Sequence, residues 1–274
     1  MMQALCDDLR AEYEALADLV ESFSASQWQA ATGFFHWTPW DEIAHLLYFD
    51  ETALQALDDA DAFARDARTL TERTTVGGEA ISAIARSTYG DLDGPALVAR
   101  WRLGFGQLVD RLTAFAPRDR LPWYGPTMSA RSFATARLME CWAHGQDVWD
   151  AVRQRRPVHA RLAHIAHLGV ATFAWSFVVR GLVAPPQAPF VALTGPGEAP
   201  WTWGEPASAE RISGPAEDFC LVVTQRRHVA DTRLRVEGLT AARWMAVAQC
   251  FAGEAAVGPG PGVRRIDVDD TDGR

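Results

Sequence analysis

The chain contains no lysine; all 26 of its basic residues are arginine. This absence excludes every mechanism that needs a lysine amine, including Schiff-base chemistry, a phosphate-binding P-loop and catalysis by a lysine base. The basic residues are outnumbered by 35 acidic ones, which gives a formal net charge of −9. Because the balance is acidic and no basic run interrupts it, we expect no nucleic-acid partner.

Long apolar runs are absent as well. The longest apolar segment, residues 168–179, is interrupted by Thr172 and Ser176, and it is shorter than the roughly 18 to 20 residues of a membrane span. No signal peptide opens the chain, since Met1 leads directly into an acidic amphipathic segment. The four cysteines include no CxxC pair, which favours reduced, buried thiols. We therefore expect a soluble, cytoplasmic protein without a membrane partner.

Helical periodicity dominates the first part of the chain. Apolar residues recur at intervals of three and four along four long segments, which are 3–23, 38 to beyond 54, 95–115 and 129–152. In the second segment Thr38 can cap the helix, Pro39 suits its first position, and Asp41 follows three residues after the cap. Four long helices joined by connections of mixed length predict an α-helical four-helix bundle over residues 1–156.

The composition changes after this bundle, and a smaller α+β domain is expected over residues 157–252. Its predicted elements are a helix over 160–181, a β-hairpin from 190–194 and 201–203, a third strand at 211–213, a helix over 215–223, a strand at 234–236 and a last helix over 241–251. From residue 253 the chain is rich in glycine and proline and then acidic, so residues 253–274 predict a disordered tail.

Three residues form a candidate metal site. Glu140 and His144 lie four residues apart in the fourth segment, which places both side chains on one face of a helix. Carboxylate oxygen and imidazole nitrogen both suit Zn²⁺, and His45 in the second segment is the best candidate for a third ligand. Simpler interpretations stay open, because a histidine on an apolar helix face is often a core residue and a Glu–His pair is often solvated.

Neighbouring residues allow two interpretations each. Asp147 can orient His144 by accepting its second ring hydrogen, although a charge on the helix surface explains it equally well. Cys141 adjoins a proposed ligand in sequence but lies about 100° away around the helix, so we expect it to pack in the core. A second histidine group, 159–167, lacks a further ligand at suitable spacing, and packing between domains is the preferred interpretation.

Together the two ligand motifs resemble those of the DinB-like metal-binding bundles. The first motif, Trp-Thr-x-x-Asp-x-x-x-His, covers residues 37–45, and the second, Glu-x-x-x-His-Gly-x-Asp, covers residues 140–147. Within those bundles the chain looks like the mycothiol-dependent maleylpyruvate isomerase branch, in which helical His, Glu and His bind a divalent metal, usually zinc. In that branch an α+β domain similar to sterol carrier proteins follows the bundle, and residues 212–226 look like its helix. The chain resembles in particular an actinobacterial group known only as metal-binding.

The resemblance implies an enzyme that uses an external thiol such as mycothiol on a small electrophilic substrate. Three protein ligands leave a metal position open, and a thiol that enters it loses its proton. Addition and elimination of this thiol would isomerise an unsaturated acid, whereas addition alone would give a conjugate. Arg226 matches an arginine of the second domain that reaches towards the active site and could hold a substrate carboxylate. A surface salt bridge is the alternative role for Arg226.

Other functions remain open at this stage. Water in the open position would make the same site a hydrolase. A biosynthetic enzyme can keep this scaffold and change its reaction, since fold does not fix function. A non-catalytic protein that binds a metal or a small ligand is the competing class. We expect a monomer or a homodimer.

Overall fold

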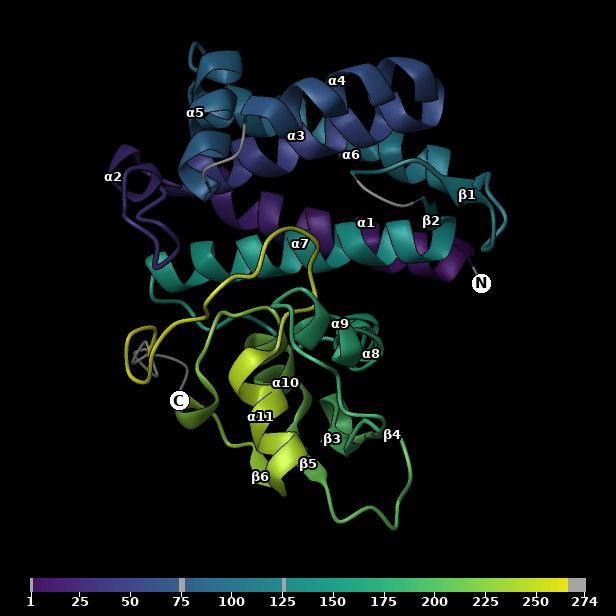
Figure 1. Cartoon of the computed structure of the whole chain (residues 1–274). Coiled ribbons are helices and arrows are strands. Elements are labelled where there is room, and N and C mark those ends of the chain that lie inside the picture. The colour runs from purple at the N-terminus through teal and green to yellow at the C-terminus, as the bar shows by residue number, and fades with distance from the viewer. Residues whose placement is uncertain (1, 74–76, 125–126, 266–274) are drawn as a thin grey trace. The chain divides into compact units, whose positions relative to one another are not determined.

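The computed structural model describes residues 2–73, 77–124 and 127–265, and it divides into two compact units. The first unit spans Met1–Gln154 and the second spans Arg155–Arg274, so the division falls two residues before the boundary expected from the sequence. The chain is mostly helical, with a small sheet in the second unit (Figure 1). Along the described ranges, no helix has both the length and the apolar character that crossing a membrane requires.

Four long helices form the body of the first unit (Figure 1). They are α1 (Met2–Glu21), α3 (Pro39–Asp58), α6 (Gly94–Thr113) and α7 (Ala130–Ala151). Both α1 and α3 pack against α6 and α7. The shorter elements are α2 (Ala25–Trp28), α4 (Ala60–Arg73), α5 (Gly77–Tyr89) and the strand pair β1 (Arg120–Leu121) and β2 (Met128–Ser129). The helices expected from the four apolar segments are all present.

Helix α1 is typical of how the sequence produces this packing. Leu5, Leu9, Leu16 and Val20 recur at helical intervals and are buried on its inner face. Tyr13 lies on the same face, stacked on the ring of Phe105 from α6 with the centroids 4.8 Å apart. Helix α7 differs, because it buries polar residues around much of its surface as well as apolar ones. Buried polar groups need partners, so α7 is the helix on which a functional site is expected.

The start of α6 gives a test of this packing. A Cβ atom added to Gly94 would lie 2.2 Å from Cε2 of the buried Trp28 ring. We expect Gly94→Ala to lower the free energy of unfolding by about 1–3 kcal/mol, since the core must shift to admit the methyl group. Gly104→Ala on the same helix meets only Leu47 at 3.8 Å and should raise stability by up to about 1 kcal/mol. Urea unfolding distinguishes the two, and equal effects would contradict the packing described.

The second unit is a four-stranded sheet with helices packed on it (Figure 1). Its strands are β3 (Phe190–Thr194), β4 (Pro200–Trp203), β5 (Arg211–Pro215) and β6 (Arg235–Glu237), in the order β4-β3-β5-β6. Strand β3 pairs antiparallel with β4 and parallel with β5, and β5 pairs antiparallel with β6. The helices are α8 (Leu162–Ala171), α9 (Phe173–Val178), α10 (Ala216–Val223) and α11 (Leu239–Val247).

Two expectations for this unit need correction. The single helix expected over 160–181 is divided at Thr172, whose hydroxyl donates to the carbonyls of Leu168 at 2.8 Å and Gly169 at 3.1 Å. A threonine side chain that bonds to the preceding turn competes with regular helix geometry. The last helix begins at Leu239 and ends at Val247, so it is shorter at its carboxyl end than expected.

The first part of the tail that is expected to be disordered, residues 253–265, makes hydrogen bonds to the second unit. Residues 253–265 form no helix or strand, but hydrogen bonds hold them to the rest of the unit. The Gln225 side-chain amide donates to the carbonyl of Ala256 at 3.0 Å, and the backbone N–H of Gly262 donates to the Asp231 carboxylate at 2.8 Å. Residues 266–274 lie outside the described part of the chain.

Candidate metal centre

The structure brings the three predicted ligands together in the first unit. His45 lies on α3, and Glu140 and His144 lie on α7, with candidate ligand atoms all within 4.8 Å of one another. His144 Nε2 is 3.4 Å from Glu140 Oε2, and the two imidazole rings have centroids 4.3 Å apart. Ligand atoms on a tetrahedral zinc with bonds of about 2.0–2.1 Å are separated by about 3.3 Å. The donor set and its spacing therefore suit a divalent metal.

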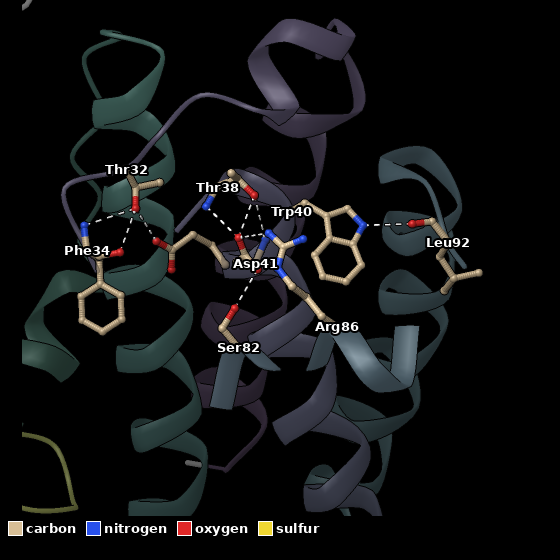
Figure 2. Close-up of polar contacts among 9 residues, drawn as sticks. Thr32, Phe34, Thr38, Trp40, Asp41, Ser82, Arg86 and Leu92 are labelled. Carbon is tan, nitrogen blue, oxygen red and sulfur yellow. Dashed lines mark hydrogen bonds and ion pairs between the residues drawn. The ribbon is translucent and has the colours of Figure 1, made fainter. Parts of the chain in front are cut away.

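The start of α3 fixes where His45 lies. Thr38 is the N-cap, and its backbone N–H and hydroxyl each lie 2.9 Å from Asp41 Oδ2, in a capping box. The Asp41 carboxylate also accepts hydrogen bonds from Ser82 at 2.9 Å and from Arg86 at 2.6 Å, both on α5 (Figure 2). In this position Asp41 caps the start of α3 and joins α5 to it. It is not among the candidate ligands.

Trp40 of the same motif contributes to this attachment. Its indole N–H donates to the carbonyl of Leu92 at 3.0 Å, and the Arg86 guanidinium lies over its ring at 5.2 Å from the centroid (Figure 2). The first turn of α3 is therefore held from two sides, through Asp41 and through Trp40. Because its first turn is held in this way, α3 keeps His45 in a fixed position relative to the surrounding helices.

Sequence reasoning missed Glu42, which contacts a proposed ligand directly. Glu42 Oε2 lies 2.7 Å from His144 Nδ1, and Glu42 Oε1 accepts a hydrogen bond from the Thr32 hydroxyl at 2.9 Å. The side chain is fully buried. Its one sequence signal is its position three residues before His45, on the same helix face. Acidic residues are common in the first turn of any helix, so this signal alone does not indicate a site.

Asp147 is buried beside these groups. A carboxylate oxygen of Asp147, one of Glu42 and a ring nitrogen of His144 all lie within 4.8 Å of one another. Asp147 is not exposed, so the alternative of a helix-surface charge is wrong. The orienting role suggested for Asp147 stays a prediction, whereas the 2.7 Å contact with His144 Nδ1 comes from Glu42.

Aromatic rings surround the two histidines. The Trp37 ring is stacked on the His144 ring at a centroid distance of 5.9 Å, and Phe34 meets the same imidazole edge-on at 5.3 Å. Phe49 lies 4.8 Å from the His45 ring. Trp37 is 4% exposed, and its indole N–H has no hydrogen-bond partner within the described residues. The histidines therefore have aromatic rings on one side and buried carboxylates on the other.

A buried ion pair joins the same two helices one to two turns away from the ligands. Asp50 of α3 accepts hydrogen bonds from Tyr13 at 2.6 Å, Trp101 at 2.9 Å and Arg137 Nε at 2.9 Å. Burial raises the pKa of Asp50, and the Arg137 guanidinium and the other donors oppose this rise. Burial alone would lower the pKa of Arg137, but the charge of Asp50 raises it, so the guanidinium stays protonated.

Two polar links therefore connect α3 with α7. Glu42 and His144 form the first link, and Asp50 and Arg137 form the second. Glu42 precedes Asp50 along α3, whereas their partners occur in the reverse order along α7, so the two helices run antiparallel. His45 and Glu140 lie on the stretches between the links, and the third proposed ligand, His144, belongs to the first link.

Arg226 and the cysteines complete the predicted set. Arg226 belongs to the second unit, where it is buried and donates from Nη1 to the carbonyl of Thr224 at 2.8 Å. Its role towards a substrate carboxylate stays a prediction.

All four cysteines are buried and none forms a disulfide, as expected. Burial raises the pKa of Cys6 to about 11 and that of Cys220 well above its usual value.

Comparison with known proteins gives two family matches and one similar protein. Residues 9–149 match the model of the mycothiol maleylpyruvate isomerase N-terminal domain, and residues 185–236 match the model named wyosine base formation. An uncharacterized protein of Mycobacterium tuberculosis is 41% identical over 256 residues, which cover 90% of this chain and 94% of that protein.

Solved structures agree at the level of the fold. The crystal structure of the mycothiol-dependent maleylpyruvate isomerase aligns with a TM-score of 0.53 and 14% identity, covering 81% of this chain and 88% of that chain. A histidine-to-alanine mutant of that enzyme aligns with a TM-score of 0.52. The family match spans the helices that carry His45, Glu140 and His144. On this evidence, the chain belongs to the mycothiol maleylpyruvate isomerase N-terminal domain family.

Proposed function

We propose that His45, Glu140 and His144 bind a divalent metal, zinc by the chemistry of the donors, and that the protein is an enzyme. In this proposal the site uses a low-molecular-weight thiol of the mycothiol type to isomerise a small electrophilic substrate, or to form a conjugate with it. The observation that carries the proposal is the convergence of the three ligand atoms within 4.8 Å. Family membership supports the choice of thiol.

When bound, zinc held by three protein ligands keeps one position for an exogenous group and favours a thiolate over a thiol there. The four cysteines of the chain are buried, which does not favour any of them as this thiol. Burial raises the pKa of Cys6 to about 11 and raises that of Cys220 well above its usual value, so both stay protonated at neutral pH. In this proposal an external thiol is the nucleophile.

The residues around the ligands have separate tasks in this proposal. Phe34, Trp37 and Phe49 keep bulk water from the histidines, and the Trp37 N–H offers a hydrogen bond to the bound molecule. Arg226 of the second unit holds the carboxylate of the substrate. Thiolate addition to a cis carbon–carbon double bond, rotation about the resulting single bond and loss of the same thiolate give the trans acid. Addition followed by protonation of the carbon gives a conjugate.

The proposal also assigns a domain type to each of the two units. We propose that the four long helices form a DinB-like bundle and that the second unit is a sterol-carrier-like domain. The packing of α1 and α3 against α6 and α7 supports the first assignment. The sheet with flanking helices in the second unit supports the other.

The proposed function is tested by incubating the protein with mycothiol and maleylpyruvate, the substrate in the name of the structural relative. We expect the trans product only when metal and thiol are both present, and proton NMR measures its formation. Chelation should remove the activity and added zinc should restore it. Activity that survives chelation, or that needs no thiol, would contradict the mechanism. A zinc-loaded protein that neither isomerises nor conjugates any unsaturated acid would contradict the enzymatic proposal and leave the metal site standing.

A further inference from the structure

We infer that Glu42 is a positioning residue for the metal site: it fixes which nitrogen of His144 faces the other ligands, and Thr32 holds Glu42 in place. This inference rests on the proposed metal-binding function and adds two residues to it. Neither is a specified residue of the ligand motifs, since Glu42 stands at an unspecified position of the first motif and Thr32 precedes that motif.

The carboxylate of Glu42 has a named partner on each oxygen. Oε2 lies 2.7 Å from His144 Nδ1, and Oε1 lies 2.9 Å from the Thr32 hydroxyl. A 2.7 Å contact holds a hydrogen between the two atoms, and in this inference His144 Nδ1 donates it to the carboxylate. The other ring nitrogen, Nε2, then faces the remaining ligands and lies 3.4 Å from Glu140 Oε2. The contact thus fixes the direction of the ring and, in this inference, its tautomer.

The distance between Glu42 and His144 favours a hydrogen bond over shared ligation of a metal. Glu42, His144 and Asp147 also cluster closely enough to suggest a metal site of their own. Two ligand atoms on one tetrahedral zinc lie about 3.3 Å apart, because the bonds are about 2.0–2.2 Å long. The 2.7 Å separation between Glu42 Oε2 and His144 Nδ1 is shorter, and it is a typical distance for a charge-assisted hydrogen bond. Glu42 therefore orients the ligand.

The loop that carries Thr32 is closed by its own hydrogen bonds, and Thr32 and Trp37 at its two ends are buried. The Thr32 backbone N–H donates to the carbonyl of Trp37 at 2.6 Å, and the Trp37 N–H donates to the carbonyl of Phe34 at 2.9 Å. The Phe34 N–H donates to the Thr32 hydroxyl at 3.2 Å (Figure 2). One short loop therefore supplies the hydroxyl that holds Glu42 and the two aromatic rings that flank His144.

Backbone conformation in this loop agrees with a specific role. Phe35 and His36 both adopt left-handed conformations, with φ of 47° and 56°. Such conformations cost free energy for residues other than glycine and persist where the surrounding structure requires them. Here they return the chain from Phe34 to Trp37, which places Thr32 and both rings beside α7.

The inference predicts a graded loss of metal affinity. Glu42→Gln keeps the shape of the side chain and removes its charge, so zinc affinity should fall by about 10- to 100-fold. Thr32→Val keeps the charge and removes one hydrogen bond to it, so a smaller loss is expected. Zinc affinity is measured on the full chain by competition with a chromophoric chelator. Thermal unfolding of each metal-free variant shows whether it is folded.

Two comparisons separate this inference from the proposed function. Glu51→Gln is the matched control, because Glu51 is a hydrogen-bonded carboxylate on the same helix whose partners are Tyr89 and Arg100. Its zinc affinity should equal that of the wild type. If the wild-type protein binds no zinc, the proposed function fails. If the wild type binds zinc and Glu42→Gln binds it equally well, the role of Glu42 alone is overturned.

A spectroscopic measurement does not depend on the variants. In the metal-free wild type, the ¹⁵N shifts of the His144 ring should show the proton on Nδ1. A proton on Nε2 would overturn the inference. If Glu42→Gln fails to fold, the zinc affinity of Thr32→Val and the tautomer of His144 decide the question. Reduced affinity together with a proton on Nδ1 supports the inference. Unchanged affinity together with a proton on Nε2 contradicts it.

Discussion

Replacing His144 with alanine is expected to reduce the metal content of the purified protein from about one divalent ion per chain to almost none. The variant keeps two of the three ligands, and the buried carboxylate of Glu42 loses its partner on one oxygen. The loss of affinity should exceed the roughly 100-fold upper limit for a residue that only orients a ligand. Elemental analysis of protein purified without chelator measures the content.

A histidine away from the site provides the control. His167 is exposed in the second unit, where its Nδ1 accepts a hydrogen bond from Trp203 at 3.2 Å. His167→Ala should retain the full metal content. The proposed site fails if the wild type stays metal-free after incubation with zinc, or if His144→Ala retains as much metal as His167→Ala.

Arg137→Ala is expected to destabilise the first unit by about 3–5 kcal/mol, the largest stability change predicted for this chain. The substitution leaves Asp50 fully buried without the guanidinium that opposes its desolvation. Tyr13 and Trp101 still donate to the carboxylate, but they carry no charge to balance it. Urea unfolding of the wild type and the variant at neutral pH measures the difference.

The effect of Arg137→Ala should depend on pH in a defined direction. Burial already raises the pKa of Asp50 in the folded state, and removal of Arg137 raises it further. A carboxyl group with a raised folded-state pKa stabilises the fold most below its unfolded value of about 3.9, and that stability is lost as pH rises through the folded value. The deficit of the variant should therefore be larger at pH 8 than at pH 5.

Two controls test the cause. Adding Asp50→Asn to Arg137→Ala removes the buried charge and leaves an acceptor for Tyr13 and Trp101, so it should recover part of the stability. Arg10→Ala breaks an exposed ion pair with Asp110 and should cost no more than about 1 kcal/mol. A double variant that is no more stable than Arg137→Ala, or a deficit that does not change with pH, would contradict the role given to the buried charge.

Apolar spacing was sufficient to predict the four long helices of the first unit, because burial of one face decides where a helix forms. The four-residue spacing of Glu140 and His144 likewise predicts that both side chains point the same way. What spacing could not predict is Glu42, because its contact depends on the antiparallel register of α3 and α7. That register follows from packing between residues about a hundred positions apart in the chain.

The corrections in the second unit have a similar origin. Thr172 lies within an apolar, helix-like stretch, and only the hydrogen bonds of its hydroxyl show that the helix divides there. Residues 253–265 have the composition of a disordered segment, yet backbone and side-chain amides hold them in place. Composition reports how much apolar surface a segment can bury, and it does not report such individual hydrogen bonds.

The two links between α3 and α7 have a consequence for the proposed metal site. Both links are made by side chains of the protein alone, so a metal is not needed to hold the ligand helices together. If the site binds an ion, little conformational entropy should be lost on binding. In contrast to small domains that unfold without zinc, this protein is then expected to stay folded after chelation. An ion bound at this site would be removed or exchanged for another divalent metal without a refolding step.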